Sequence, residues 1–248
     1  MSELAPAAPS RVVSLVPSLT EAIAVTAPGV LVGATAWCAH PVDLDVPRLG
    51  GTKNPDVAGV VALRPDLVVM NAEENREPDI DALRAAGLRV WVTDPETVPA
   101  AITQLRHLLG ELGATRVSWL DASERAWAEL WTGPRRTAVA PIWRRPWMAL
   151  GRDTFAGDLL ARLGVDNVLA SHAERYPRID LTDLPSCELV VLPDEPYAFA
   201  ADDGPEAFDP TPCALVSGRH LTWYGPSLAE AREVLAAQLG AAAPTSAS

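Results

Sequence analysis

The sequence predicts an α/β protein of two lobes, each built on a parallel sheet, with a helix that joins the lobes. Short β-branched runs alternate with segments of helical periodicity over residues 11–112, and the alternation resumes after residue 134. This rhythm is typical of parallel sheets that are covered by helices. Between the two series lies a long amphipathic stretch, residues 113–132, without a strand pattern. A chain of 248 residues is long enough for two such lobes.

The first series opens with a strand, turn and helix. The run RVVSLV at 11–16 is a strand pattern that ends at Pro17. We expect Ser18 to cap the following helix, because Glu21 stands three residues later, as in a capping box. A second strand, 31–35, leads into the loop WCAHP.

The rest of the first lobe repeats the pattern. Residues 54–72, NPDVAGVVALRPDLVVMNA, predict a capped helix, a break at Pro65 and a buried strand. Residues 79–94 predict a helix that stops at Gly87 before the strand RVWVT. A helix over 97–113 closes the lobe.

The second lobe follows the joining helix, on which Val117, Leu120, Ala128 and Trp131 form an apolar stripe. Its elements are predicted as a strand at 137–143, a helix at 154–164, strands at 187–193 and 213–218, and a helix at 226–240. We therefore expect a lobe at 10–112, a bridging helix at 113–132, a lobe at 133–240 and a disordered tail at 241–248.

Composition limits the classes of partner and compartment. The net charge of −12, with no basic run, argues against a nucleic-acid partner, since phosphate backbones need clustered Lys and Arg. The start of the chain shows no basic head before a long apolar run and no lipidation cysteine, so the sequence predicts a cytoplasmic protein. Cys38, Cys187 and Cys213 have no framework spacing, which favours reduced thiols.

Five segments carry a resemblance to a known family. They are RVVSLVPSLTEAI, LVGATAWCAHP, PRLGGTKNPDVAGVVALRPDLVVMNAEEN, DIDALRAAGLRVWVT and HLTWYGPS. In this order the chain, over about residues 10–240, resembles the helical-backbone (class III) solute-binding proteins, the family of the periplasmic cobalamin-binding protein and ferric siderophore receptors. The resemblance implies two Rossmann-like lobes bridged by one rigid helix, with the ligand cleft between the lobes. In transport members a glutamate on each lobe docks the ABC permease, and the first-lobe position corresponds here to Ala58.

The loops that follow the strands are the candidate ligand site, because ligands gather at the carboxyl ends of parallel strands. Aromatic rings and cations in these loops suit a large planar ligand with polar groups at its edge. We therefore predict a non-catalytic binding protein for a cobalamin-like corrinoid or another metal chelate, such as a siderophore or haem. The candidate ligand-binding residues are Pro17, Ser18, Trp37, His40, Thr52, Lys53, Arg76, Trp143, Arg144, Trp147, Tyr197, His220, Trp223 and Tyr224.

Roles follow from residue type. The tryptophans at 37, 143, 147 and 223 would provide stacking surface. Lys53, Arg76 and Arg144 would meet acceptors at the ligand edge, and His40 and His220 would be the groups nearest to a bound metal.

Three alternatives stay open. A zinc or manganese ion would draw on Cys38, His40, His220 and Glu195, although Cys-x-His supplies only two of the three or four ligands that zinc needs. A tetrapyrrole chelatase would use His40 or His220 with Glu195, yet the sequence shows no phosphate loop, nucleophile elbow or other catalytic signature, and we predict no catalytic residue. The third alternative is an interaction protein that kept the fold and lost the ligand.

Overall fold

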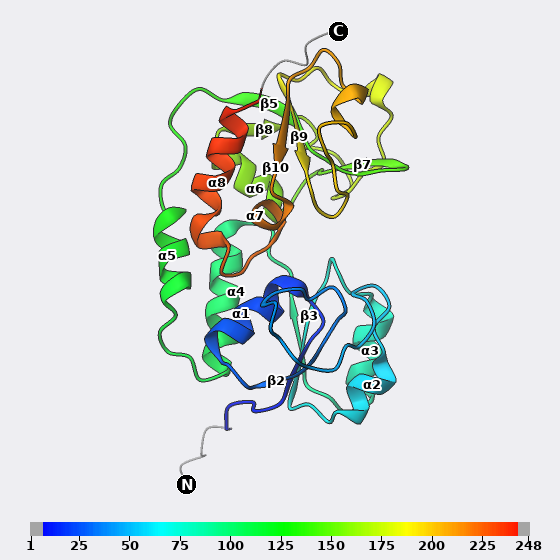
Figure 1. The fold of residues 1–248 in the computed structure, drawn as a ribbon, viewed down its shortest axis with the longest axis vertical. Coiled ribbons are helices and arrows are strands. Elements are labelled where there is room, and N and C mark those ends of the chain that lie inside the picture. The colour runs from blue at the N-terminus through cyan, green and yellow to red at the C-terminus, as the bar shows by residue number, and fades with distance from the viewer. Residues whose placement is uncertain (1–6, 243–248) are drawn as a thin grey trace. The chain divides into compact units, whose positions relative to one another are not determined.

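The structure, a computed structural model, describes residues 7–242, and the chain divides into two compact units (Figure 1). The first unit comprises residues up to Asp94, then 102–121 and Tyr224–Pro226, and the remaining residues form the second. Each unit contains one four-stranded sheet whose strands all pair in parallel, so the α/β prediction of two parallel-sheet lobes is confirmed. From residue 243 on, the tail predicted at 241–248 lies outside the described residues.

The first unit is close to its prediction. Its strands are β1 (Val12–Ser14), β2 (Leu31–Ala34), β3 (Leu67–Asn71) and β4 (Val90–Thr93), in the order β2-β1-β3-β4. Every residue of β3 is buried, as expected for a central strand with helices on both faces. The helices α2 (Val57–Ala62) and α3 (Glu77–Ala85) lie side by side (Figure 1).

Two local sequence signals mark helix boundaries in this unit, as predicted. Asp56 caps α2, since its carboxylate accepts a hydrogen bond from the N–H of Gly59 at 2.9 Å. Gly87 has a φ of +81° after α3, a conformation that glycine adopts at little cost.

Helix α1 (Pro17–Thr26) corrects the predicted capping box. The N-cap is Val16, two residues before Ser18, so Pro17 is in the first turn, and no side chain caps the helix. Proline favours the first helical position because its φ is fixed and it has no N–H to satisfy. Ser18 is therefore inside the helix, and its buried Oγ has no hydrogen-bond partner among the described residues.

The second unit contains the strands β5 (Arg136–Val139), β8 (Val165–Asn167), β9 (Leu189–Pro193) and β10 (Cys213–Val216), in the order β10-β9-β5-β8. Its helices are α6 (Phe155–Ala161), α7 (Gly218–Thr222) and α8 (Leu228–Gly240), with short 3-10 turns at Leu181–Asp183 and Pro205–Ala207. An antiparallel hairpin, β6 (Pro141–Arg144) and β7 (Trp147–Ala149), stands apart from this sheet. The strand predicted at 137–143 is thus two strands, β5 and β6, with different partners.

Two helices have residues in both units. They are α4 (Val98–Glu111) and α5 (Ser118–Ala126). The bridging helix predicted at 113–132 contains α5, which ends at Ala126, and the domain boundaries given above stay a prediction. None of the helices in residues 7–242 is both long and apolar enough to span a bilayer.

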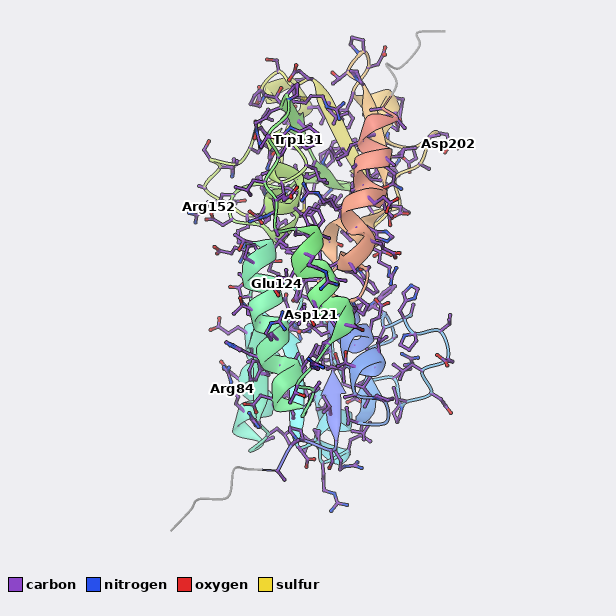
Figure 2. The ribbon with its side chains drawn as sticks, turned by 90° about the vertical axis from the view of Figure 1, so that its left-hand side faces the viewer. Arg84, Asp121, Glu124, Trp131, Arg152 and Asp202 are labelled. Carbon is purple, nitrogen blue, oxygen red and sulfur yellow. The ribbon has the colours of Figure 1, made fainter. Side chains whose placement is uncertain are left out.

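The surface of α5 explains the amphipathic pattern. Leu120, Ser123 and Trp127 are buried, whereas Glu124 is exposed, and Figure 2 shows Asp121 and Glu124 along this helix. Trp131 lies beyond the helix end, where its indole N–H donates to the carbonyl of Pro134 at 2.8 Å.

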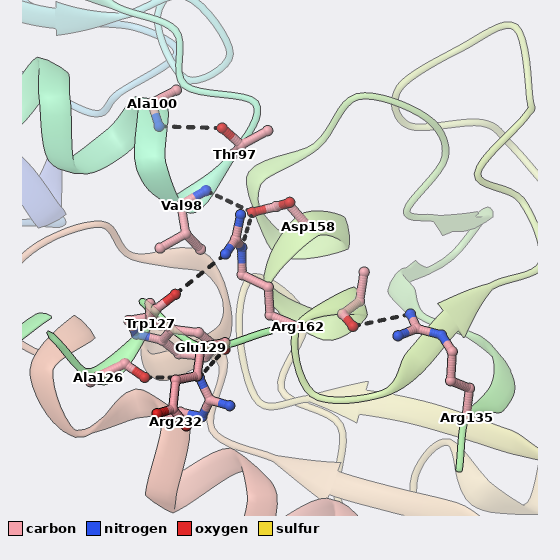
Figure 3. A network of polar contacts seen from close by, with 11 residues as sticks. Thr97, Val98, Ala100, Ala126, Trp127, Glu129, Arg135, Asp158, Arg162 and Arg232 are labelled. Atoms are coloured by element: carbon pink, nitrogen blue, oxygen red, sulfur yellow. Dashed lines mark hydrogen bonds and ion pairs between the residues drawn. The ribbon is translucent and has the colours of Figure 1, made fainter. Parts of the chain in front are cut away.

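A polar network in the second unit holds the end of α5 (Figure 3). The guanidinium of Arg232 donates to the carbonyls of Ala126 and Glu129 at 2.9 and 2.7 Å and lies over the buried Trp127 ring. Arg162 donates to the carbonyl of Trp127 at 3.3 Å and to Asp158 at 2.7 Å. Side chains thus satisfy the carbonyl of Ala126, the last residue of α5, and two carbonyls just beyond it, in place of a further helical turn.

Candidate functional site

The loop WCAHP leaves the carboxyl end of β2 and is held by Arg48. The guanidinium of Arg48 donates to the carbonyls of Cys38 at 2.9 Å, Thr35 at 3.3 Å and Leu44 at 2.8 Å. Trp37 lies between two of these fixed carbonyls and is 68% exposed. An exposed indole on a braced loop is an available stacking surface.

Cys38, by contrast, is buried. The residue is 1% exposed, and its Sγ lies 3.1 Å from the hydroxyls of both Thr20 and Thr35. Burial raises the pKa of the Cys38 thiol above its usual value of 9.0, which disfavours the thiolate that a metal requires. Among residues 7–242, no group of three or more His, Cys, Asp or Glu side chains is placed to hold a metal ion.

Two further loops of the first unit are tied together. Asn75 donates to the carbonyl of Thr52 at 2.9 Å, and Lys53 donates to the carbonyl of Glu73. Gly51 lies against the Trp37 ring, because a Cβ at this position would be 2.9 Å from the indole nitrogen. The loop 50–54 therefore connects the tryptophan to the loop that follows β3.

Arg76 is engaged within its own helix. Its guanidinium donates to Asp79 at 2.8 and 3.1 Å, and this bond raises the pKa of Arg76. His40 is partly exposed and precedes a cis peptide bond to Pro41.

Pro17, Ser18 and Tyr224 are all buried. The Tyr224 hydroxyl accepts a hydrogen bond from Asn71 at 2.7 Å and lies 2.9 Å from Thr93 Oγ1. Gly225 packs on the backbone of Ser18, since a Cβ there would be 2.9 Å from its carbonyl oxygen. Because they are buried, these three candidates pack inside the protein and present no exposed ligand-binding surface.

In the second unit four candidates meet around the β6–β7 hairpin. The rings of Trp143 and Tyr197 are edge to face with centroids 5.7 Å apart. Trp147 stacks on Phe199 at 5.9 Å, and the Arg144 guanidinium lies 5.4 Å from the Trp147 ring centre. A shallow pocket of about 570 Å³ opens beside the hairpin. It is lined by Arg144, Arg145, Pro146, Trp147, Ile179, Asp180 and Leu181.

Acidic residues that the sequence analysis missed neutralise Arg144. Its guanidinium forms ion pairs with Asp203 and Glu206, and Asp203 also accepts a 2.6 Å hydrogen bond from the Tyr197 hydroxyl. Burial opposes ionisation of Glu206, but the Gly204 N–H and Arg144 outweigh it, so the pKa of Glu206 lies below its usual value. The acidic run between 202 and 206, close after PYAF, was the available sequence signal.

A second group forms around α7. His220 Nδ1 lies 2.8 Å from the Ser217 hydroxyl, and Nε2 lies 3.2 Å from the Glu230 carboxylate. Trp223 donates its indole N–H to Glu195 at 3.1 Å. Both ring nitrogens of His220 are therefore used inside the unit, away from the metal role that the sequence suggested.

The structure thus gathers candidates within each unit. Trp143, Arg144, Trp147 and Tyr197 come together, and Trp223 meets Glu195, whereas Cys38 and His220 face other partners. Whether the gathered residues contact a ligand stays a prediction.

Curated proteins and solved structures both include proteins that are similar to this chain. No protein-family model matches the chain. A curated relative, the vitamin B12-binding protein of Photorhabdus laumondii, is 24% identical over 251 residues, which cover 94% of this chain and 89% of the relative. The solved periplasmic vitamin B12-binding protein of Vibrio cholerae superposes with a TM-score of 0.75 at 17% identity, covering 95% of this chain and 98% of that one. A periplasmic heme-binding protein in complex with two hemes gives a TM-score of 0.74 at 22% identity, covering 92% and 97%.

The chain therefore has the fold of periplasmic solute-binding proteins, and the resemblance to the class III proteins is confirmed. The relatives are named as binding proteins and not as enzymes.

The predicted cytoplasmic location is wrong, because the solved relatives are periplasmic proteins. That prediction rested on the absence of a signal-peptide pattern and a lipidation cysteine among the first residues. An absence of this kind does not determine where a protein of this fold is found.

Proposed function

We propose that this chain is a non-catalytic binding protein for a large metal chelate, either a corrinoid such as vitamin B12 or a haem. The supporting observation is the aromatic cluster on the β6–β7 hairpin, where Trp143, Trp147 and Tyr197 contact one another through rings or shared neighbours. Flat π surfaces in a concave, partly apolar region suit a macrocycle better than a small ion.

The first unit has an aromatic surface of its own. Trp37 is exposed on a loop that Arg48 fixes, and the Asn75 bridge holds the neighbouring loop at Thr52. Such preorganisation lowers the entropic cost of binding. We therefore assign Trp37 and the loop that carries it to ligand binding, in addition to the hairpin cluster.

The enzyme and metal-ion alternatives lose support. The Cys38 thiol is buried on two threonine hydroxyls, and His220 is held by Ser217 and Glu230. Glu195, the carboxylate proposed for a chelatase, accepts the Trp223 N–H. A general base must reach the proton that it moves, and these groups are committed to the protein itself.

Docking on an ABC permease is a separate question. Ala58 is exposed on α2, so this helix presents an alanine where the resemblance places a docking carboxylate. We therefore confine the proposal to ligand binding.

The test is a titration of the purified full chain with cyanocobalamin, haem and a ferric siderophore, followed by tryptophan fluorescence. An absorbance spectrum and elemental analysis beforehand would detect a ligand that co-purifies. Saturable quenching at one ligand per chain is expected for a corrinoid or haem, because four of the eight tryptophans, at 37, 143, 147 and 223, are candidate ligand-binding residues. Absence of saturable binding by all three compounds would refute the proposal.

A further inference from the structure

Asn75 joins three segments of the first unit through its side chain. The amide nitrogen donates to the carbonyl of Leu15, which directly follows β1, at 3.2 Å and to the carbonyl of Thr52 at 2.9 Å. The Oδ1 atom accepts the N–H of Asn71, the last residue of β3, at 2.8 Å. Asn75 is 3% exposed, so these bonds form away from bulk water, where a polar group left without a partner is costly.

Asn71 fixes the direction of Asn75. The two residues bond in both directions, because the N–H of Asn75 also donates to the carbonyl of Asn71 at 3.0 Å. The Asn71 side chain accepts the N–H groups of Glu73 and Glu74 at 2.8 and 2.9 Å. Its amide nitrogen donates to the Tyr224 hydroxyl at 2.7 Å. The turn between the two asparagines is therefore closed by their own side chains, and its geometry is fixed.

The loop that Asn75 holds at Thr52 supports the exposed tryptophan of this unit. The N–H of Ala36, the residue before Trp37, donates to the carbonyl of Gly50 at 2.8 Å. The Trp37 ring lies so close to Gly51 that a Cβ there would be 2.9 Å from the indole nitrogen. A shift of the backbone at Thr52 would therefore move the surface beneath the ring.

We propose that Asn75 is a positioning residue of the ligand site, which sets the orientation of the Trp37 ring through the backbone of residues 50–54. Its effect on ligand affinity rests on the proposed function, whereas its effect on Trp37 does not. A carboxamide suits this position because it supplies two N–H donors and one acceptor in a single plane. In the sequence, Asn75 follows two glutamates and precedes an arginine, a pattern typical of a polar surface turn.

The variant Asn75→Asp isolates the two donated bonds. Its side chain has nearly the same shape and still accepts the Asn71 N–H, but in its ionised form it turns lone pairs toward the carbonyls of Leu15 and Thr52. Burial and these two oxygens raise the pKa of the introduced carboxyl, so mild acid restores one donor. The variant should be defective at about pH 8 and partly restored at about pH 5.5, whereas Asn75→Ala, which cannot titrate, should be defective at both.

The first readout needs no ligand. In the full chain labelled with 5-fluorotryptophan, each of the eight tryptophans contributes a fluorine resonance, and the Trp37 resonance is the one missing from Trp37→Phe. In Asn75→Asp at about pH 8 this resonance should be shifted from its position in the unaltered protein, and amide exchange at 50–54 should be faster. Acidification should return the resonance toward the unaltered position. In Asn75→Ala the shift should persist.

The second readout is affinity for cyanocobalamin or, if it does not bind the unaltered protein, for haem. Asn75→Asp should bind severalfold more weakly than the unaltered protein at about pH 8, and the loss should shrink at about pH 5.5. Each comparison is made at one pH, because ionisable groups near the joined loops are common to all these chains. They are His40, Lys53, Glu73, Glu74, Arg76 and Tyr224.

Asn167 provides a matched control in the second unit. Its side chain donates to the carbonyls of Leu150 and Gly151 at 2.9 and 3.1 Å and accepts the N–H of Leu169 at 3.1 Å, the same set of bonds. Asn167→Asp should lower the melting temperature at about pH 8. It should leave the Trp37 resonance and the ligand affinity unchanged.

The variant Gly51→Ala tests the last link without altering Asn75. The added methyl group meets the exposed Trp37 ring, which can move aside, so the protein should fold normally. The Trp37 resonance should shift at both pH values, and affinity should fall. This variant keeps the inference testable if the Asn75 variants do not fold, since unchanged affinity despite a displaced ring would overturn it.

The outcomes separate this inference from the proposed function. A Trp37 resonance that is unchanged in folded Asn75→Asp at about pH 8, or a shift that acid does not reverse, would overturn the inference. So would a reversible shift without any change in the affinity of a ligand that the unaltered protein binds. If the resonance behaves as expected but neither compound binds the unaltered protein, Asn75 positions Trp37 and the proposed function is wrong.

Discussion

The hydroxyl of Tyr224 lies 2.7 Å from the side-chain nitrogen of Asn71, although 153 residues separate them in the sequence. The chain of hydrogen bonds continues from Tyr224 to Thr93 Oγ1 at 2.9 Å, and from Thr93 to the carbonyl of Met70 at 3.2 Å. Burial raises the pKa of Tyr224, so the hydroxyl stays protonated and can donate to Thr93. A segment from the end of the chain is thereby fixed to the ends of β3 and β4.

Replacing Tyr224 by Phe should destabilise the protein by about 1–2 kcal/mol, because two buried hydrogen bonds are lost while Asn71 keeps its 3.0 Å bond to the Thr93 carbonyl. Denaturant unfolding followed by circular dichroism measures this. Tyr197→Phe, whose hydroxyl is only partly buried, is the matched control and should cost less. Equal stability of Tyr224→Phe and the unaltered protein would contradict the structural role.

Replacing Trp37 by Ala should weaken binding of cyanocobalamin by about 0.5–1.5 kcal/mol, the usual range for one aromatic contact. Its melting temperature should hardly change, since the side chain is 68% exposed. Isothermal titration with parallel melting curves separates the two effects. Unchanged affinity would remove Trp37 from the ligand site.

Arg48 should affect ligand affinity indirectly, because it fixes the loop that carries Trp37. Arg48→Ala frees three loop carbonyls and should weaken binding of cyanocobalamin even though Trp37 is intact. In Arg48→Ala the further loss on replacing Trp37 should be smaller than in the unaltered background, because the two residues serve one contact. Independent, additive losses in this double-mutant cycle would show that Arg48 does not position Trp37.

Thiol reactivity tests the placement of Cys38. The thiol is buried with a raised pKa, so it should not react with Ellman's reagent at pH 8 in the folded protein. The half-buried Cys213, with its pKa raised to about 11, should react slowly. All three free cysteines should react in denaturant. If Cys38→Ala lowers the number of fast-reacting thiols in the folded protein, the thiol is accessible and the placement is wrong.

Acid should reveal the role of Asp66. Its carboxylate accepts hydrogen bonds from the N–H and hydroxyl of Ser10 and from the N–H of Arg11, and the Ser10 N–H is the main cause of its lowered pKa. A depressed pKa in the folded state contributes stability above the ordinary value of 3.8, and this stability is lost as the pH falls through the folded pKa. Asp66→Asn should therefore melt at a lower temperature than the unaltered protein at pH 7.

The difference in melting temperature should narrow below about pH 3.8, where the native carboxylate also becomes protonated. Asp43→Asn, a change at an exposed loop carboxylate, serves as the control. A difference that does not depend on pH would show that the charge of Asp66 has no part in it.

Local signals were sufficient for the main strands and helices. The uninterrupted apolar run of β3 and the glycine after α3 leave few alternatives, because burial on both faces and a left-handed residue have clear sequence signatures. The length of α5 was not predictable in this way. Its amphipathic pattern continues past Ala126, and the helix ends where Arg232 and Arg162, distant in sequence, take up its carbonyls.

The candidate site could likewise be predicted only in part. That Trp37 lies in a loop after a strand could be predicted, since loop position depends on neighbouring elements. Trp143 and Trp147, which the sequence placed in a loop, lie instead in the paired strands β6 and β7. The pairing of the charged candidate side chains could not be predicted. The pairing of Arg144 with Asp203 and Glu206, and of His220 with Glu230, depends on tertiary placement, and it changes cations predicted to attract anions into neutralised groups.

The most direct test of ligand binding by the candidate residues is amide hydrogen exchange of the full chain with and without saturating cyanocobalamin. The proposed function predicts slower exchange on ligand binding at 36–40 and 50–54 in the first unit, and at 143–147, 193–199 and 219–223 in the second. Protection located only outside these segments, or no change in exchange with saturating ligand, would contradict it.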